Sequence, residues 1–259
     1  MKIVVLLKEV PDTYGDRKLD LETGLADRGA SDAVADEIDE RALEVALSYA
    51  DSTEGEVEVS VLTMAPAGAT SSIRKGLAMG AASATHIVDD DLVGADLGLT
   101  AEVLTAALQA QGFDLVITGN QSTDGAAGML PAMLSELLGV PGLTNLSSVE
   151  IDAETVSGTR LSDDAAMRVS ASLPAVISIT EALPDARFPN FKGIMAAKKK
   201  PLQVTSLADL GIDATDMTPS RAIMTEISER PPRTAGVKIT DDGTAAEQLA
   251  AFLAENRLV

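Results

Sequence analysis

The chain has 259 residues, and 40 acidic against 20 basic residues give it a formal net charge of −20, which argues against nucleic acid or anionic membranes as general partners. It has no cysteine, which excludes disulfides, thiol catalysis and cysteine-ligated clusters, while a hydrophobic fraction of 46% excludes a disordered chain. Because no apolar run reaches membrane-spanning length, we expect a cytoplasmic protein that is not membrane-embedded, and the acidic composition is typical of a halophile.

Apolar patterning predicts four β–α repeats before Pro141. Residues 3–7 (IVVLL) form a continuous apolar run, typical of a strand buried on both faces of a parallel sheet. Leu43, Ala46 and Leu47 recur at helical spacing in the segment that follows. Further strands are predicted at 57–64, 85–90 and 113–119, and further helices at 71–80, 96–111 and 128–138. This alternation predicts an α/β fold with a doubly wound, mostly parallel sheet.

The pattern changes after Pro141. Segments 146–158 and 167–180 are predicted as strands joined by turns, without an intervening helix. Residues 181–235 contain six prolines and, apart from 207–211, little helical periodicity, so we predict an extended arm without its own core. A final amphipathic helix is predicted at 245–255. We therefore expect an α/β domain at 1–180, an arm at 181–235 and a C-terminal helix within 236–259.

Two loops form the candidate ligand site. In a doubly wound sheet, ligands bind beyond the carboxyl ends of the strands where strand order reverses. If the first four strands have the order 3-2-1-4, the loops at 8–29 and 119–128 meet there. The first is unusually long and polar and suits a lid. The second (GNQSTDGAAG) contains three glycines before a helix, so its N–H groups suit a phosphate, although an ordinary glycine turn has the same composition.

Other kinds of site are less well supported. The loops contain no P-loop, and no GxGxxG follows the first strand. His86, the only histidine, lies in a predicted strand and is interpreted as structural. The acidic run at 89–91 is interpreted as a solvated turn rather than a metal site. With no nucleophile, base and oxyanion donor assembled, we predict a binding protein with neither catalytic residues nor a metal.

Several longer segments carry a family resemblance. They are VVLLKEVPDT (4–13), DEIDERALEVAL (36–47), IRKGLAMGA (73–81), DLVITGNQSTDGAAGMLPAMLSELLGVP (114–141), LPAVISIT (173–180) and RFPNFKGIMAAKKKPLQVTSLADLGID (187–213). In this order they closely resemble the β subunit of electron transfer flavoproteins, the family that includes the FixA proteins. The resemblance implies a Rossmann-like fold of the adenine-nucleotide-binding type.

The resemblance also implies a function. Such a β subunit forms a heterodimer with an α subunit that holds most of an FAD, and it shields that flavin while a site inside β holds AMP. The heterodimer shuttles electrons from flavin dehydrogenases to a quinone oxidoreductase, so the subunit is an electron carrier rather than an enzyme. In a bifurcating branch, β instead binds a second FAD that oxidises NADH. The VPDT segment and long first loop resemble the bifurcating and Fix type, whereas KKKPLQVTSLADLG resembles AMP-containing members.

Family positions map onto a nucleotide site in this sequence. The mapped residues are Leu6, Asp36, Glu37, Ile38, Asp39, Met64, Gly119, Asn120, Gln121, Ser122, Thr123, Asp124, Gly125, Ala126 and Ala127. Thr13 and Ile38 are expected near the partner's flavin. Many relatives have lysine where Asn120 stands and an Asp-Thr pair where Ala126 and Ala127 stand, so the backbone N–H groups are expected to bind more of the phosphate.

The arm is expected to bind partners. The resemblance makes 186–201 the recognition loop, with Phe191 as an apolar anchor for dehydrogenases. The residues expected at partner interfaces are Phe191, Ile194, Met195, Lys198, Lys199 and Lys200. Alternatively, the aromatic side chains pack the arm on the α subunit and the lysines are solvated. A stand-alone adenine-nucleotide sensor of the universal-stress-protein kind shares the architecture, but has no use for such an arm.

Overall fold

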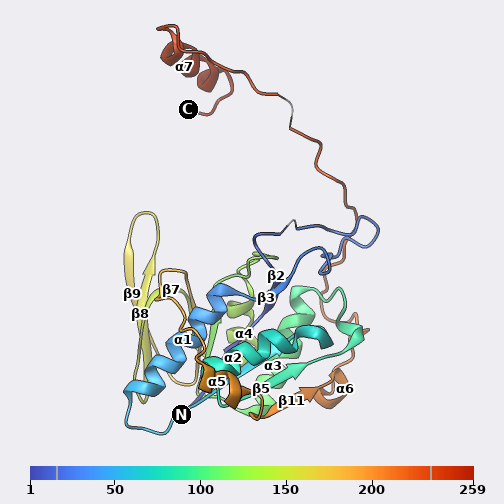
Figure 1. Ribbon diagram of the computed structural model, residues 1–259, viewed down its shortest axis with the longest axis vertical. Helices are drawn as coiled ribbons and strands as arrows, with labels where there is room; N and C mark the ends of the chain where they lie inside the picture. Colours follow the sequence, from blue (N-terminus) through green and yellow to red (C-terminus); the bar gives the residue numbers. More distant parts are fainter. Residues whose placement is uncertain (16, 234) are drawn as a thin grey trace. The chain divides into compact units, whose positions relative to one another are not determined.

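The computed structural model describes residues 1–15, 17–233 and 235–259, in two units, Met1–Thr225 and Glu226–Val259. The first unit is built on a nine-stranded sheet of order β11-β5-β4-β1-β6-β10-β7-β8-β9 (Figure 1). Its strands are β1 (Lys2–Leu6), β4 (Glu58–Met64), β5 (Ser83–Ile87), β6 (Leu115–Gly119), β7 (Gly142–Ile151), β8 (Thr155–Leu161), β9 (Ala166–Ser172), β10 (Ala175–Ile179) and β11 (Leu202–Thr205). The short strands β2 (Glu9–Pro11) and β3 (Ala33–Ala35) form a separate antiparallel pair.

The helices of this unit include four that connect the central strands. They are α1 (Glu37–Ser52), α2 (Thr70–Met79), α3 (Leu97–Gln111) and α4 (Leu130–Leu138), followed by the shorter α5 (Phe191–Ala197) and α6 (Leu207–Leu210), with 3-10 turns η1 (Ala67–Ala69) and η2 (Asp90–Leu92). Strands β11 to β7 are mutually parallel, and β8 and β9 add antiparallel hairpins. The predicted doubly wound, mostly parallel fold is confirmed, as is the order of its first four strands.

The central strand β1 is buried on both faces because its side chains alternate between two apolar clusters. Ile3 and Val5 join the cluster under α1 and α2, while Val4 and Leu6 join the cluster under α3 and α4. The helix side chains in these clusters include Leu43 and Leu47 of α1, Ile73 and Leu77 of α2, Leu104 and Leu108 of α3, and Leu134 of α4. Burial on both faces explains why the strand is continuously apolar.

Local sequence determines where the helices begin and end. Asp36 and Asp96 accept hydrogen bonds from N–H groups in the first turns of α1 and α3. Gly80 and Gly139 follow the last residues of α2 and α4 with positive φ, at +153° and +66°. Both glycines end helices where the sequence predicts it.

The segment after residue 180 contributes to the first unit. Helix α5 packs on α2, strand β11 pairs with β5 at the edge of the sheet, and α6 lies against α3. Ala197, Thr205 and Leu207 are buried there. The partner-binding role of 181–235 stays a prediction. In the second unit, α7 (Ala245–Glu255) coincides with the predicted C-terminal helix.

Candidate nucleotide-binding site

The candidate site lies where strand order reverses. β1 and β6 are parallel neighbours, and the chain crosses from β1 to β4 on one side, whereas β10 flanks β6 on the other. The connections after Leu6 and Gly119 therefore leave the same edge of the sheet. The antiparallel pairing of β2 with β3 brings together the two ends of the connection between β1 and α1. Most of the predicted lid loop lies between these two strands.

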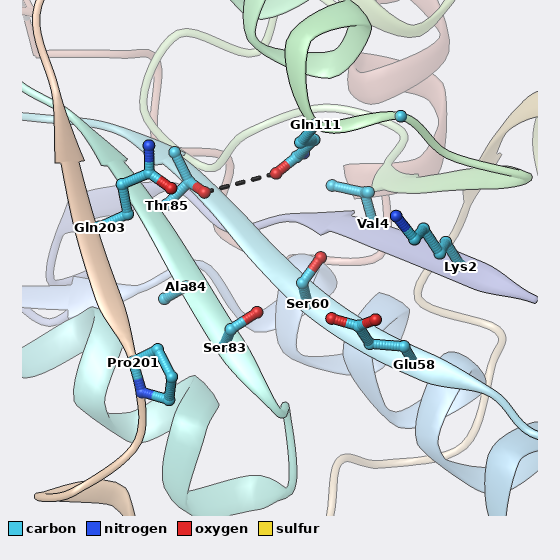
Figure 2. A pocket seen from close by; sticks show the side chains of 11 residues that line it. Lys2, Val4, Glu58, Ser60, Ser83, Ala84, Thr85, Gln111, Pro201 and Gln203 are labelled. Carbon is cyan, nitrogen blue, oxygen red and sulfur yellow. Dashed lines mark hydrogen bonds between the residues drawn. The ribbon is translucent and has the colours of Figure 1, made fainter.

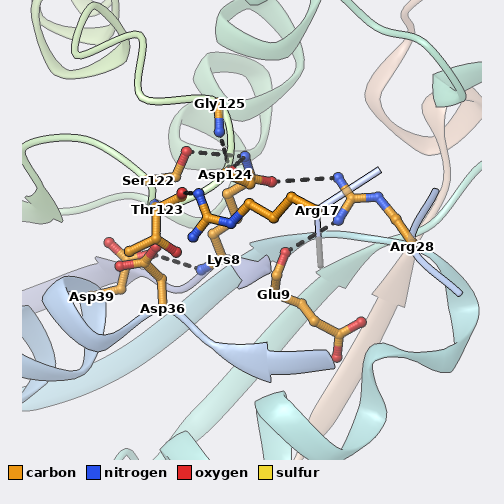
Figure 3. Close-up of polar contacts among 10 residues, drawn as sticks. All are labelled: Lys8, Glu9, Arg17, Arg28, Asp36, Asp39, Ser122, Thr123, Asp124 and Gly125. Carbon is orange, nitrogen blue, oxygen red and sulfur yellow. Dashed lines mark hydrogen bonds and ion pairs between the residues drawn. The ribbon is translucent and has the colours of Figure 1, made fainter. Parts of the chain in front are cut away.

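Asp36 is the first residue that joins the two loops. One carboxylate oxygen caps α1 by accepting a hydrogen bond from the N–H of Ile38 at 3.0 Å. The other accepts one from the N–H of Thr123 at 2.8 Å, in the loop after β6 (Figure 3). Asp36 is buried, so this contact fixes the glycine-rich loop to the start of the helix.

Asp39, one turn into α1, completes the junction. Its carboxylate accepts hydrogen bonds from the N–H groups of Lys8 at 2.8 Å and Gly119 at 2.9 Å. Burial, reinforced by the charge of Asp36, raises the pKa of Asp39 to about 7, against the opposing effect of the two N–H groups. A Cβ on Gly119 would lie 2.7 Å from Asp39 Oδ1, so glycine is required for this approach.

Asp124 is the third carboxylate of the site, and it forms ion pairs with two basic side chains. Lys8 Nζ lies 2.7 Å from Asp124 Oδ1 and 3.2 Å from Ser122 Oγ, and Arg28 Nη2 lies 3.9 Å from Asp124 Oδ2. The N–H of Gly125 also donates to Asp124 at 2.6 Å. Partial burial acts to raise the pKa of Asp124, but the hydrogen bonds from Lys8 and Ser122 outweigh it and lower the pKa to about 2.

The loop after β6 keeps polar groups without partners. Asn120 Oδ1 and Thr123 Oγ1 are buried and have no hydrogen-bond partner among residues 1–15, 17–233 and 235–259. Ala126 adopts a left-handed conformation with φ of +48° and donates its N–H to the carbonyl of Ser122 at 3.0 Å. The unpartnered polar atoms and the strained turn make this loop a candidate for contact with a ligand.

Comparisons with known proteins show the family of the chain. The electron transfer flavoprotein domain matches residues 23–210. The chain is 44% identical over 265 residues to the electron transfer flavoprotein subunit beta of Mycobacterium tuberculosis, with 99% of each chain covered. It is 30% identical over 249 residues to the Bacillus subtilis protein of the same name, with 96% of this chain and 94% of the relative covered. The chain belongs to the electron transfer flavoprotein β-subunit family.

A relative with a different name is also similar over nearly the whole chain. It is the caffeyl-CoA reductase-Etf complex subunit CarD of Acetobacterium woodii, 30% identical over 256 residues, with 98% of this chain and 96% of the relative covered.

The structure brings together part of the predicted nucleotide site. Asp36, Ile38, Asp39, Gly119, Ser122, Thr123 and Asp124 form the junction described above. Leu6 and Met64 lie at or near the same strand ends, Leu6 buried and Met64 half-buried. Asn120 is half-buried, whereas Thr13, Glu37, Gln121, Gly125, Ala126 and Ala127 are exposed. The assignment of these residues to a ligand stays a prediction.

Three basic residues of the site were missed by sequence reasoning. Lys8 and Arg28 contact Asp124, and the Arg17 guanidinium donates to the carbonyl of Thr123 (Figure 3). All three come from the connection after β1. Residues 8–28 contain four basic residues but also six acidic ones, so composition gave little indication of this role. Asn120 provides no cation, so the positive charge comes from the opposite loop.

The predicted recognition loop presents apolar side chains to solvent. Phe188 and Phe191 are 94% and 79% exposed, and Ile194 and Met195 are also exposed. Asn190 caps α5 by accepting a hydrogen bond from the N–H of Gly193 at 2.8 Å. Phe191 is therefore the first residue of an ordered, short helix rather than part of an irregular loop.

Two basic side chains fix this loop to the body. The Arg187 guanidinium donates to both carboxylate oxygens of Glu44 on α1, at 2.7 and 2.9 Å. Lys200 Nζ donates to the carbonyls of Leu77 and Ala81 at 2.8 and 2.6 Å, at the end of α2, and burial lowers the pKa of Lys200. Lys198 and Lys199 are exposed, so the three lysines differ in environment.

His86 and Asp89 of the acidic run form hydrogen bonds with backbone groups. His86 is buried in β5, with Nε2 3.0 Å from the carbonyl oxygen of Ala65. Asp89 accepts hydrogen bonds from the N–H groups of Asp91 and Leu207. Over the described ranges 1–15, 17–233 and 235–259, no group of three acidic or histidine side chains suits a metal. Within the same ranges, no helix has the length and apolar character needed to span a bilayer.

A second polar hollow lies at the opposite edge of the sheet. It has a volume of about 200 Å³ and is lined at the amino ends of β1, β4, β5 and β11 by side chains that include Lys2, Ser60, Thr85 and Gln203 (Figure 2). Thr85 donates to Gln111 Oε1 at 3.4 Å. Ligands of doubly wound folds bind beyond the carboxyl ends instead, so the candidate site remains the one at the Asp36–Asp39 edge.

The raised pKa of Asp39 predicts a specific dependence of stability on pH. Because its pKa is about 7 when folded and 3.8 ordinarily, the folded protein binds more protons between about pH 4 and 7. The contribution of Asp39 to the free energy of unfolding therefore falls as pH rises through this window, by at most about 1.4 kcal/mol per pH unit. Asp39→Asn should remove this fall, measured by urea unfolding across the window.

Asp36→Asn is the matched control for that experiment. It leaves Asp39 ionisable but removes a charge that raises the pKa of Asp39, so the fall should persist and move to lower pH. Identical pH profiles for the wild type and Asp39→Asn would show that Asp39 does not titrate in this way.

Proposed function

We propose that the chain is the β subunit of a heterodimeric electron transfer flavoprotein, which carries electrons from flavin dehydrogenases to a quinone oxidoreductase in the cytoplasm. Family membership over almost the full chain supports the assignment. The subunit is proposed as an electron carrier rather than an enzyme. The FAD, shared with an α subunit, supplies the redox chemistry when bound, and the protein supplies position and insulation.

The nucleotide proposed for the β subunit is AMP. The junction of the loops after β1 and β6 would hold it, with Thr123 Oγ1 and Asn120 Oδ1 as unpartnered polar groups and Lys8 and Arg28 as nearby cations. The main observation behind the proposal is that Asp36 and Asp39, at the start of α1, accept hydrogen bonds from N–H groups in both loops. These hydrogen bonds preorganise a polar loop at the edge of the sheet where such folds bind nucleotides.

A bifurcating role is the second candidate. In that role the same site would hold a second FAD and oxidise NADH. It is favoured by the similarity to a subunit named as part of a caffeyl-CoA reductase-Etf complex. A stand-alone nucleotide sensor is disfavoured, because the exposed Phe188 and Phe191 suit a partner surface.

Cofactor content of the complex separates these functions. The chain is co-purified with its α partner in high potassium chloride, which screens the charge of −20, and the bound molecules are released by heat and quantified. One FAD and one AMP per heterodimer are expected. Two FAD without AMP, together with NADH oxidation, would support the bifurcating role, whereas a chain that purifies without an α partner or flavin would contradict both.

Phe191 is proposed as the anchor for partner dehydrogenases. Truncation of a well-buried aromatic anchor removes much of an interface's energy, so Phe191→Ala should slow reduction of the heterodimer by a dehydrogenase by about tenfold or more. Flavin and AMP content should not change, because the side chain is exposed in the free subunit. The measurement is stopped-flow flavin reduction.

Leu161→Ala is the control for loss of an exposed apolar side chain, because Leu161 is 59% exposed in β8. It should leave the reduction rate unchanged. Equal rates for the wild type and Phe191→Ala would contradict the anchor role.

A further inference from the structure

The loop after β6 holds a carboxylate, Asp124, that pairs with cations of the connection after β1. Asp36 and Asp39 already fasten the loop to α1 through backbone N–H groups. Asp124 instead faces two side-chain cations, Lys8 and Arg28, from the connection after β1 (Figure 3). The cations hold Asp124 in addition to the contacts that shape the site.

The cations remain accessible although the carboxylate is enclosed. The side chains of Lys8 and Arg28 are 41% and 44% exposed, whereas the Asp124 side chain is only 12% exposed. Both basic side chains therefore keep solvent-exposed surface while they pair with Asp124. Lys8 Nζ also lies 3.2 Å from Ser122 Oγ, so its ammonium contacts two side chains of the loop at once.

We propose that Lys8 and Arg28 are the phosphate-contacting cations of the site, and that the Asp124 carboxylate occupies their place until the phosphate of a nucleotide displaces it. Carboxylate and phosphate oxygens are equivalent acceptors for a lysine ammonium or an arginine fork. A chain of net charge −20 repels anions, and these cations offset the repulsion where the ligand binds. This inference rests on the proposed nucleotide-binding function and assigns its phosphate contacts.

Beyond Thr123 the loop is held by local hydrogen bonds, from the N–H of Gly125 to Asp124 and from the N–H of Ala126 to the carbonyl of Ser122, and not by α1. Gly125 and Gly128 flank the left-handed Ala126, and the Arg28–Asp124 distance of 3.9 Å is the long end of an ion pair. The loop before Thr123, in contrast, is fixed by Asp36 and Asp39. Movement of Asp124 away from Lys8 therefore leaves the junction with α1 intact.

The test measures affinity rather than electron transfer. AMP and adenosine are titrated by calorimetry into the heterodimer after its nucleotide has been removed, at two potassium chloride concentrations. Lys8→Met should weaken AMP binding about tenfold or more and reduce its salt dependence, while adenosine binding is unchanged because adenosine has no phosphate.

Asp124→Asn distinguishes exchange from a merely structural ion pair. If Asp124 competes with phosphate, its removal frees Lys8, and AMP should bind about threefold or more tightly than to the wild type. If the pair only positions the loop, Asp124→Asn should weaken AMP binding as Lys8→Met does, and that result would overturn the exchange. Lys18→Met, an equal charge change on an exposed residue of the same connection, should leave AMP binding unchanged.

The wild-type titration tests the proposed nucleotide site separately from the phosphate contacts assigned to Lys8 and Arg28. A wild-type heterodimer that binds neither AMP nor adenosine would overturn the proposed nucleotide site together with this inference. A wild type that binds AMP, with Lys8→Met binding equally well, would overturn the inference alone. Thermal unfolding of each variant shows whether a loss of affinity reflects a loss of folded protein.

Discussion

The site depends on two buried carboxylates at the start of one helix. Asp36 and Asp39 accept hydrogen bonds from Thr123, Lys8 and Gly119, which lie in the loops after β1 and β6. Desolvation of a carboxylate opposes this arrangement, and the N–H groups and the positive end of the α1 dipole offset that cost. Without the two carboxylates, the loops after the two central strands would lose their attachment to α1, and the contacts of Lys8, Arg17 and Arg28 would still join them to each other.

Helix α1 also connects the candidate nucleotide site to the predicted recognition loop. Asp36 and Asp39 lie at its start, and Glu44 in its next turns holds Arg187 just before the exposed Phe188. Its apolar side, with Leu43 and Leu47, is buried against the sheet. One rigid helix therefore orients both surfaces, which suits a subunit whose proposed role is to hold cofactors and partners in fixed geometry.

The sequence predicts the fold far better than the contacts of the site. Continuous apolar strands, helical spacing and glycine ends are local patterns, so the β–α repeats followed from them. The order of the central strands was a condition taken from the usual topology of doubly wound folds, and the structure matches it. The bond from Gly119 to Asp39 joins residues 80 positions apart, and pairing of Lys8 with Asp124 depends on the path of a long loop. Lys200 has the same sequence context as Lys199, and only packing against α2 distinguishes it.

The central claim is that adenine nucleotide binds at the carboxyl edge between β1 and β6. Hydrogen exchange of the heterodimer with and without AMP tests it directly, because ligand contact slows exchange of the amides that it covers. The account predicts slower exchange in residues 36–39 and 119–127, with no change in strands lining the hollow near Ser60 and Thr85. Protection confined to that opposite edge would contradict it.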